Sequence, residues 1–180
     1  KEAILAEYPG TDLPELFVWD AAGERHSLSC ITGCGMAPVT FLGTGEEPTE
    51  HVLNELIDCA KQWNKSGTET IMILRRPEEL KNATLQKTLK QLDKVRIYFD
   101  REEAAEKTAA IMGADPEKLP LLVLTEEGRR GIYACAGYHV GSVDLLLKIL
   151  MRASGPFTSL TSGKTDRKEE KDDNVNRKAE

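Results

Sequence analysis

Residues 38–57, PVTFLGTGEEPTEHVLNELI, decide the fold of this chain. The apolar run at residues 39–42 predicts a buried strand, and the glycine-flanked residues 43–45 predict a tight loop. The residues EEP at 46–48 predict the start of a helix, because proline suits a first helical turn and acidic side chains suit the positive end of the helix dipole. The loop between a strand and a helix is where α/β folds usually place their chemistry, so we expect the candidate site here.

The rest of the chain alternates between strand-like and helix-like segments. Further strands are expected at residues 17–19 and 25–28, which form a hairpin around the turn at 20–23, and at residues 70–74, 95–99, 119–124 and 131–136. Residues 30–37 are expected to form a glycine-rich loop. Helices are expected after residue 48, with Val52, Leu53, Leu56, Ile57, Ala60 and Trp63 facing a core, from Pro77 with Leu85, Leu89 and Leu92 on one face, from Asp100 to Gly113, and from Ser142 onward.

This alternation predicts an α/β fold with a mixed central sheet flanked by helices on both faces and an N-terminal β-hairpin. We expect one domain at residues 13–153. Residues 1–12 are expected to be a lead-in from an upstream region, because the chain begins at Lys1 without a preceding Met. Residues 154–180 are expected to be a charged, disordered tail, because such a composition buries too little apolar surface to offset ordering.

The charge pattern argues against nucleic acid as a partner. The net charge is −6, and the segment at residues 164–180 holds six basic and six acidic residues, so the acidity belongs to the preceding part. No basic stripe with interleaved aromatic residues is present. No apolar run approaches the length of a membrane span, so none is expected in this segment.

Four cysteines are present, too few for a disulfide scaffold. Cys30 and Cys34 are separated by three residues and could form a local disulfide in an oxidising compartment or remain two free thiols. Cys59 is expected in a helix and Cys135 in an apolar strand, where each would pack as a small hydrophobic residue.

The pattern resembles the thioredoxin-like fold, in the branch of extracytoplasmic thiol-disulfide proteins. The resemblance covers roughly residues 13–151. It rests on the opening hairpin at residues 17–28, the strand and loop at residues 39–49, the segment LPLLVL at residues 119–124 followed by Glu127 and Gly128, and the closing GYHVGSVDLLLKIL at residues 137–150. It implies a cis peptide bond before Pro120 and a peptide-binding groove at Leu119 and Pro120.

The chain departs from this family at the Cys-x-x-Cys motif. Matching the strands places Glu46 and Thr49 at the two cysteine positions, while Pro48 keeps its place. The family's chemistry needs a thiolate at the helix N-terminus and a resolving thiol three residues later. A carboxylate and a hydroxyl cannot exchange disulfides, so the loop formed by Gly45, Glu46, Glu47, Pro48 and Thr49 is a degenerate active-site loop. We expect no enzyme activity from this domain alone.

A second resemblance concerns GTGEEPTE at residues 43–50 and the closing segment. Both are similar to the thioredoxin-like module at the C-terminal end of some large bacterial transglutaminase-like proteins. This origin implies that the partner is an upstream domain of the same polypeptide, or another protein or peptide. The resemblance to the extracytoplasmic thioredoxin-like branch implies a periplasmic or secreted location.

Three functional hypotheses follow. The first is a redox-inactive thioredoxin-like accessory or peptide-interaction domain. The second is a thiol-disulfide oxidoreductase or peroxidase that uses Cys30, Cys34 or Cys135 in place of the missing motif. The third is an acid/base hydrolase built on Glu46, Glu47 and His51, since residues four apart share a helix face. No cofactor and no metal are expected, because no His/Cys cluster has metal-ligand spacing.

Overall fold

The structure is a computed structural model that describes residues 10–153. The disordered tail expected at residues 154–180 and most of the expected lead-in lie outside the described residues. Strand β1 (Thr11–Asp12) pairs with β8 through Gly131 and Arg130. The sheet therefore begins inside the segment that the sequence assigns to the lead-in.

A single eight-stranded sheet runs through the molecule in the order β1-β8-β7-β4-β5-β6-β2-β3. Strand β4 pairs in parallel with β5, which pairs in parallel with β6, while β7 and the remaining strands run antiparallel to their neighbours. The other strands are β2 (Phe17–Trp19), β3 (Arg25–Ser27), β4 (Ala37–Phe41), β5 (Thr70–Leu74), β6 (Val95–Phe99), β7 (Leu121–Glu126) and β8 (Arg130–Ala136).

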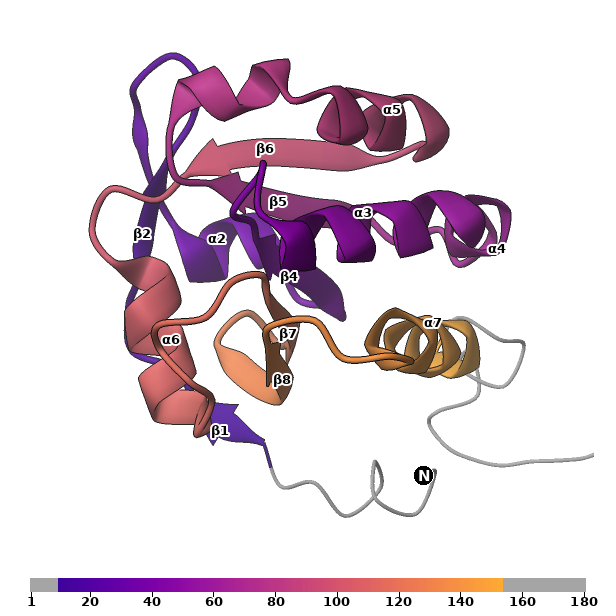
Figure 1. The fold of residues 1–180 in the computed structure, drawn as a ribbon. Helices are drawn as coiled ribbons and strands as arrows, with labels where there is room; N and C mark the ends of the chain where they lie inside the picture. The colour runs from indigo at the N-terminus through magenta and orange to yellow at the C-terminus, as the bar shows by residue number, and fades with distance from the viewer. Residues whose placement is uncertain (1–9, 154–180) are drawn as a thin grey trace, which may run out of the picture.

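Helices cover both faces of this sheet (Figure 1), which confirms the predicted α/β class. One face carries α3 (Glu47–Asp58), α4 (Ala60–Lys65), α5 (Ala83–Gln91) and α7 (Ser142–Ala153). The other face carries α2 (Leu28–Thr32) and α6 (Ala104–Met112). A short 3-10 helix, η1 (Pro77–Lys81), follows β5.

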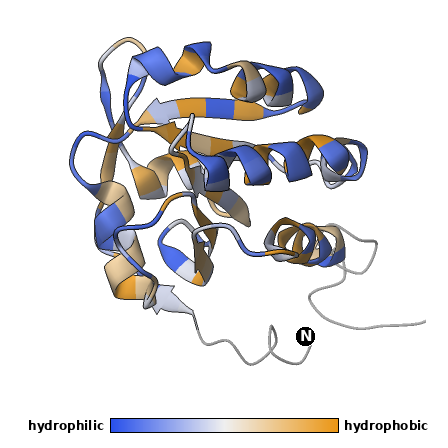
Figure 2. Cartoon of the chain, in the orientation of Figure 1, coloured by the Kyte–Doolittle hydropathy of each residue, from blue (hydrophilic) through white to orange (hydrophobic). Residues whose placement is uncertain are grey.

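The two faces of the central strands feed two separate apolar clusters. Successive side chains of a strand point to opposite faces, so Met72 and Leu74 join the cluster under α3 and α7, while Ile71 and Ile73 join the one under α6. Figure 2 shows the hydrophobic residues along the strands in the centre of the molecule, and hydrophilic residues on the outer side of α3. Strands buried on both faces explain the continuous apolar runs in the sequence.

Several helical elements differ from the sequence prediction. Residues 28–32 form α2 where a loop was expected from residue 30, because Leu28 and Ile31 are buried against the sheet and hold this turn in place. The predicted long helix after residue 48 is interrupted at Cys59, which ends α3 and precedes α4. The helix expected from Pro77 is divided into η1 and α5, because the Asn82 side chain caps a new helix by accepting a hydrogen bond from the Leu85 N–H.

The third predicted helix, α6, begins later than expected. Its N-cap is Glu103, which adopts a left-handed backbone conformation with φ of 59°. Asp100 still serves this helix end, since its two carboxylate oxygens accept hydrogen bonds from the N–H groups of Ala104 and Ala105. Among the described helices, none combines the length and the apolar character needed to cross a membrane.

Candidate functional site

The candidate site is the loop between β4 and α3. Glu46 is the N-cap of α3, and Pro48 lies in the first turn. Strand β4 pairs with β7 so that Phe41 lies opposite Leu121. The Leu119–Pro120 peptide bond, which is cis, directly precedes β7. The loop and this peptide bond therefore lie at the same end of the paired strands β4 and β7.

Thr49 satisfies a buried backbone donor of this loop. Its side chain is fully buried, and its hydroxyl oxygen accepts a hydrogen bond of 3.0 Å from the N–H of Gly43. A buried N–H without a partner costs free energy comparable to a lost hydrogen bond. Thr49 therefore holds the loop in shape.

Glu46 forms an ion pair instead of offering a free carboxylate. Its Oε2 lies 3.0 Å from Nη1 of Arg75, which follows the last residue of β5. The same guanidinium lies 2.6 Å from the carboxylate of the buried Glu79 and donates a hydrogen bond to the Thr44 carbonyl. Glu46 is thus part of an ion-pair network that joins the loop to η1.

The loop has the electrostatics of a thiol site but not its reactive atom. The N-terminus of α3 and the Arg75 guanidinium are both positive, which is the setting that stabilises a thiolate. The loop itself holds a carboxylate at Glu46 and a hydroxyl at Thr49, and neither group forms a disulfide. The contacts that these two side chains make in the structure hold the loop in place.

The acid/base trio of Glu46, Glu47 and His51 does not assemble. Glu46 points to Arg75, whereas the exposed Glu47 lies 3.3 Å from Nε2 of His51 on the outside of α3. The His51 ring stacks on Tyr138, with centroids 4.7 Å apart. Glu47 and His51 therefore form a solvated surface pair without Glu46. The three residues that the hydrolase hypothesis requires are not brought together.

Tyr138 ties the loop before α7 to α3. Its hydroxyl donates a 2.5 Å hydrogen bond to Oε2 of Glu55. This bond raises the pKa of Tyr138, because it is lost when the hydroxyl ionises beside the carboxylate. The contact fixes the closing loop on the same helix that carries the degenerate motif.

None of the four cysteines belongs to this loop, and all four are free thiols. Cys30 and Cys34 are exposed, Cys30 within the five-residue α2 and Cys34 in the turn after it. Of the two alternatives that the sequence left open for this pair, the structure contains the free thiols. The pair lies before β4, at the opposite end of that strand from the α3 N-terminus.

The other two thiols are half-buried. Burial raises the pKa of Cys59 to about 11 and also raises the pKa of Cys135, which lies opposite Leu122 in the β7–β8 pairing. Cys135 is therefore near Pro120, as the strand pairing predicts, and the N–H of Gly137 donates to the Pro120 carbonyl. A raised pKa disfavours the thiolate, so neither residue is an activated nucleophile.

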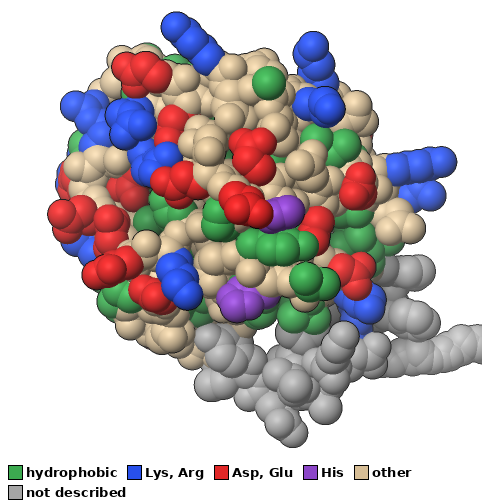
Figure 3. Space-filling model, in the orientation of Figure 1, with side chains coloured by type: hydrophobic (Ala, Val, Ile, Leu, Met, Phe, Trp, Pro, Cys, Tyr) green, Lys and Arg blue, Asp and Glu red, His purple; other side chains and the backbone are tan. Residues whose placement is uncertain are grey.

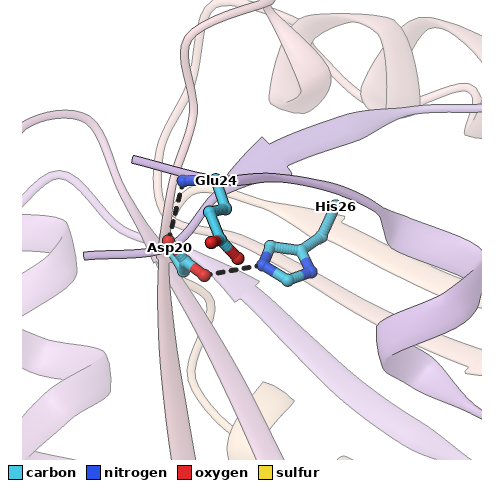
Figure 4. Close-up of side chains that lie close together, drawn as sticks. All are labelled: Asp20, Glu24 and His26. Carbon is cyan, nitrogen blue, oxygen red and sulfur yellow. Dashed lines mark hydrogen bonds and ion pairs between the residues drawn. The ribbon is translucent and has the colours of Figure 1, made fainter. Parts of the chain in front are cut away.

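The hairpin tip brings together three potential metal ligands that sequence reasoning missed. The ligand atoms of Asp20, Glu24 and His26 lie within 4.8 Å of one another (Figure 4). His26 Nε2 lies 2.7 Å from Asp20 Oδ2, and this bond lowers the pKa of Asp20. The predicted hairpin was the feature of the sequence that could have revealed this cluster, because residues on facing strands become neighbours across a turn.

The same contacts give the cluster a structural role in the turn. The second Asp20 oxygen accepts a hydrogen bond from the Glu24 N–H, and the Glu24 side chain is exposed. On the face drawn in Figure 3, acidic side chains are mixed with basic ones rather than gathered in one field. The oxygen and nitrogen atoms of this cluster are suitable ligands for a cation, and their hydrogen bonds to one another also stabilise the hairpin turn.

Comparisons with known proteins support the fold. No protein-family model and no curated protein matches this chain. Among solved structures, a putative thiol:disulfide interchange protein DsbE from Chlorobium tepidum matches 81% of this chain and 97% of its own, with 16% identity and a TM-score of 0.53. BsSco, a member of the Sco family of cytochrome c oxidase assembly proteins, matches 82% of this chain and 96% of its own, with 16% identity and a TM-score of 0.55.

A thioredoxin-like protein from Bacteroides caccae is also similar. It matches 83% of this chain and 52% of its own, with 14% identity and a TM-score of 0.56. Similarity at these identities reflects a shared backbone arrangement and not a shared activity. The chain therefore has the thioredoxin-like fold found in thiol-disulfide proteins.

Proposed function

We propose that this chain is a redox-inactive thioredoxin-like domain that binds a protein or peptide partner. One observation carries the proposal. The two positions at the entrance of α3 that would hold the working thiols are filled by Glu46, in an ion pair with Arg75, and by Thr49, in a hydrogen bond to Gly43. Both side chains hold the loop in place, and the surface around the loop remains available to bind a protein or peptide partner.

The binding surface in this proposal is formed by Leu119, Pro120 and the loop that begins at Gly45, at one end of the internal strands β4 and β7. Pro120 is buried and its carbonyl accepts a hydrogen bond from the Gly137 N–H, so the backbone here is fixed before a partner arrives. The family resemblance implies that an extended peptide binds beside this loop through main-chain hydrogen bonds, with side-chain pockets adding specificity. A preorganised surface lowers the ordering cost of binding.

The proposal extends to the context of the domain. We place it in a larger periplasmic or secreted protein, where the partner is either an upstream domain of the same polypeptide or a separate protein. Association with a transglutaminase-like protein is the specific form of this proposal. It rests on the sequence resemblance at residues 43–50 and 137–150.

A redox assay tests the first half of the proposal. The full chain is added to insulin and dithiothreitol, and the rate of insulin precipitation is compared with that of a protein-free sample. We expect equal rates, because no thiol lies at the N-terminus of α3. Catalysed precipitation would contradict the proposal.

The same assay tests the alternative oxidoreductase that uses other cysteines. The accessibility of Cys30 and Cys34 is the observation that favours this alternative. The variants Cys30→Ser, Cys34→Ser and Cys135→Ser are each expected to behave like the parent chain. A catalysed rate that disappears in one of them would establish the alternative and name its nucleophile.

A peptide selection tests the second half. Random extended peptides displayed on phage are selected on the immobilised chain, and binders are then titrated into isotopically labelled protein. We expect the amide signals of Gly45, Leu119 and Leu121 to shift first. Binders that shift only the outer face of α5 would overturn the proposed surface.

A further inference from the structure

A cavity of about 410 Å³ has Arg75, the ion-pair partner of Glu46, among its lining residues. It is formed by the hairpin turn after β2, the segment that follows β5, η1, and the segment that follows β6. Strands β5 and β6 are parallel, so their carboxyl ends lie on the same side of the sheet. Open α/β sheets usually bind ligands outside the carboxyl ends of their strands.

The body of this cavity is apolar and partly aromatic. Trp19 at the end of β2 and the buried Phe99 at the end of β6 provide ring surfaces, and Leu80 and Pro77 of η1 complete the apolar wall. Trp19 and Phe99 are paired across the β2–β6 ladder. Side chains fixed on paired strands give the cavity a preformed flat wall, and its volume lies in the range of small-molecule sites.

Two guanidinium groups at this cavity have no carboxylate partner among the described residues. Arg76 is the exposed residue that precedes η1, and Arg101 follows β6 and lies over the Trp19 ring, with Cζ 5.0 Å from the ring centroid. Arginine presents a planar set of donors that matches carboxylate and phosphate oxygens, and it stays charged at any physiological pH.

The other charged groups of the lining are already engaged. Arg75 forms ion pairs with Glu46 and Glu79, and the Asp20 carboxylate accepts hydrogen bonds from His26 and from the Glu24 N–H. The guanidinium groups of Arg76 and Arg101 are therefore the donors of the lining that remain available to an anionic ligand. An apolar wall beside two free guanidinium groups is complementary to an anion on a flat apolar body.

We propose that this cavity binds a small organic anion, with its planar apolar body against Trp19 and Phe99 and its carboxylate or phosphate group held by Arg76 and Arg101. This cavity lies at the ends of strands β5, β6 and β2, whereas the proposed peptide-binding surface lies at the ends of strands β7 and β4. The two proposals therefore stand or fall separately.

The two tryptophans of the chain provide the readout. Trp19 lines the cavity, whereas Trp63 is a buried residue of α4 whose Nε1–H donates a 2.8 Å hydrogen bond to Thr70. The full chain is labelled with ¹⁵N and titrated with 1-naphthoate, 1-naphthyl phosphate and the neutral 1-naphthamide. We expect the indole signal of Trp19 to shift with either anion while that of Trp63 stays in place.

The neutral amide is expected to bind at least about ten-fold more weakly than the better anion, because it forfeits the charge-assisted hydrogen bonds. Comparison of the two anions then shows whether the natural ligand carries a carboxylate or a phosphate. Arg76→Gln and Arg101→Gln are each expected to weaken binding of that anion about 10- to 100-fold. Lys61→Gln, which removes an exposed charge from α4, is the matched control and should leave the affinity unchanged.

Two results would overturn the proposal. One is equal binding of the amide and the anions, which would show that charge is not recognised. The other is an unchanged Trp19 signal with all three compounds at millimolar concentration. Because the same spectra report whether each variant remains folded, loss of binding through unfolding is recognised directly.

Discussion

Two regions of this molecule differ in what they provide for thiol chemistry: one has the activating environment, and the other has the exposed thiols. The entrance of α3 has the helix N-terminus, the nearby Arg75 guanidinium and the edge at Pro120, but it has no sulfur. The segment around α2 has two exposed sulfurs, those of Cys30 and Cys34, but its helix is only five residues long. Neither region has both the reactive atom and the environment that activates it.

The difference shows what the fold itself contributes. A thiolate is stabilised where oriented backbone N–H groups and a cation converge, and this depends on position in the fold rather than on the presence of cysteine. At the α3 entrance, the Glu46 carboxylate is the anion that lies beside the helix N-terminus and Arg75. The fold therefore provides a positive environment at this position without any sulfur being present there.

The strongest test of this comparison returns the thiols to the α3 entrance. The double variant Glu46→Cys with Thr49→Cys is expected to catalyse insulin reduction where the parent chain does not. A helix N-terminus lowers a cysteine pKa from about 8.5 to about 7, which raises the thiolate fraction at pH 7 roughly ten-fold. Glu46→Ser with Thr49→Ser is the matched control and should stay inactive. An inactive but folded cysteine variant would show that the loop no longer supports this chemistry.

The next largest effect concerns the reactivity of Cys59. Burial raises its pKa from 9.0 to about 11. The thiolate fraction at neutral pH is therefore expected to be about a hundred-fold below that of an unperturbed thiol, and alkylation should accelerate as the pH rises toward 11. Iodoacetamide labelling followed by peptide mass spectrometry measures this for each cysteine. Labelling of Cys59 ahead of the exposed Cys34 at pH 7 would contradict the burial argument.

A smaller effect separates the two regions by stability. Thr49→Val keeps the side-chain volume but leaves the buried Gly43 N–H without its acceptor, so the free energy of unfolding should fall by about 1–3 kcal/mol. Cys34→Ser changes an exposed residue and should alter it by less than about 0.5 kcal/mol. Urea denaturation of both variants measures the difference. Equal stability would mean that Thr49 does not hold the loop.

The smallest effect is expected at Glu46 itself. Its carboxylate is about half exposed, with a side-chain exposure of 52%, and Arg75 keeps the buried Glu79 as a second partner. Glu46→Gln should therefore reduce the free energy of unfolding by at most about 1 kcal/mol, and added salt should reduce this difference further. A salt-independent loss larger than that of Thr49→Val would reverse the order of the two contributions.

Sequence reasoning located most of the fold because its signals are local. The strands at residues 70–74 and 95–99 were predicted at their observed bounds, since each is a short run of β-branched and apolar residues between turns. It missed α2, because a five-residue helix between glycines has too few positions to show a period. It also missed the break at Cys59, because apolar spacing continues across it to Trp63.

By itself, the sequence determined that strands alternate with helices and that residues 38–57 contain no cysteine. Those are statements about residue type and spacing along one stretch of chain. Only the tertiary structure decided that Glu46 is bound by Arg75, 29 positions away, and that Arg76 and Arg101 flank one aromatic cavity. The reason is physical: such contacts depend on which strands lie side by side, and sheet order is set by burial across the whole chain.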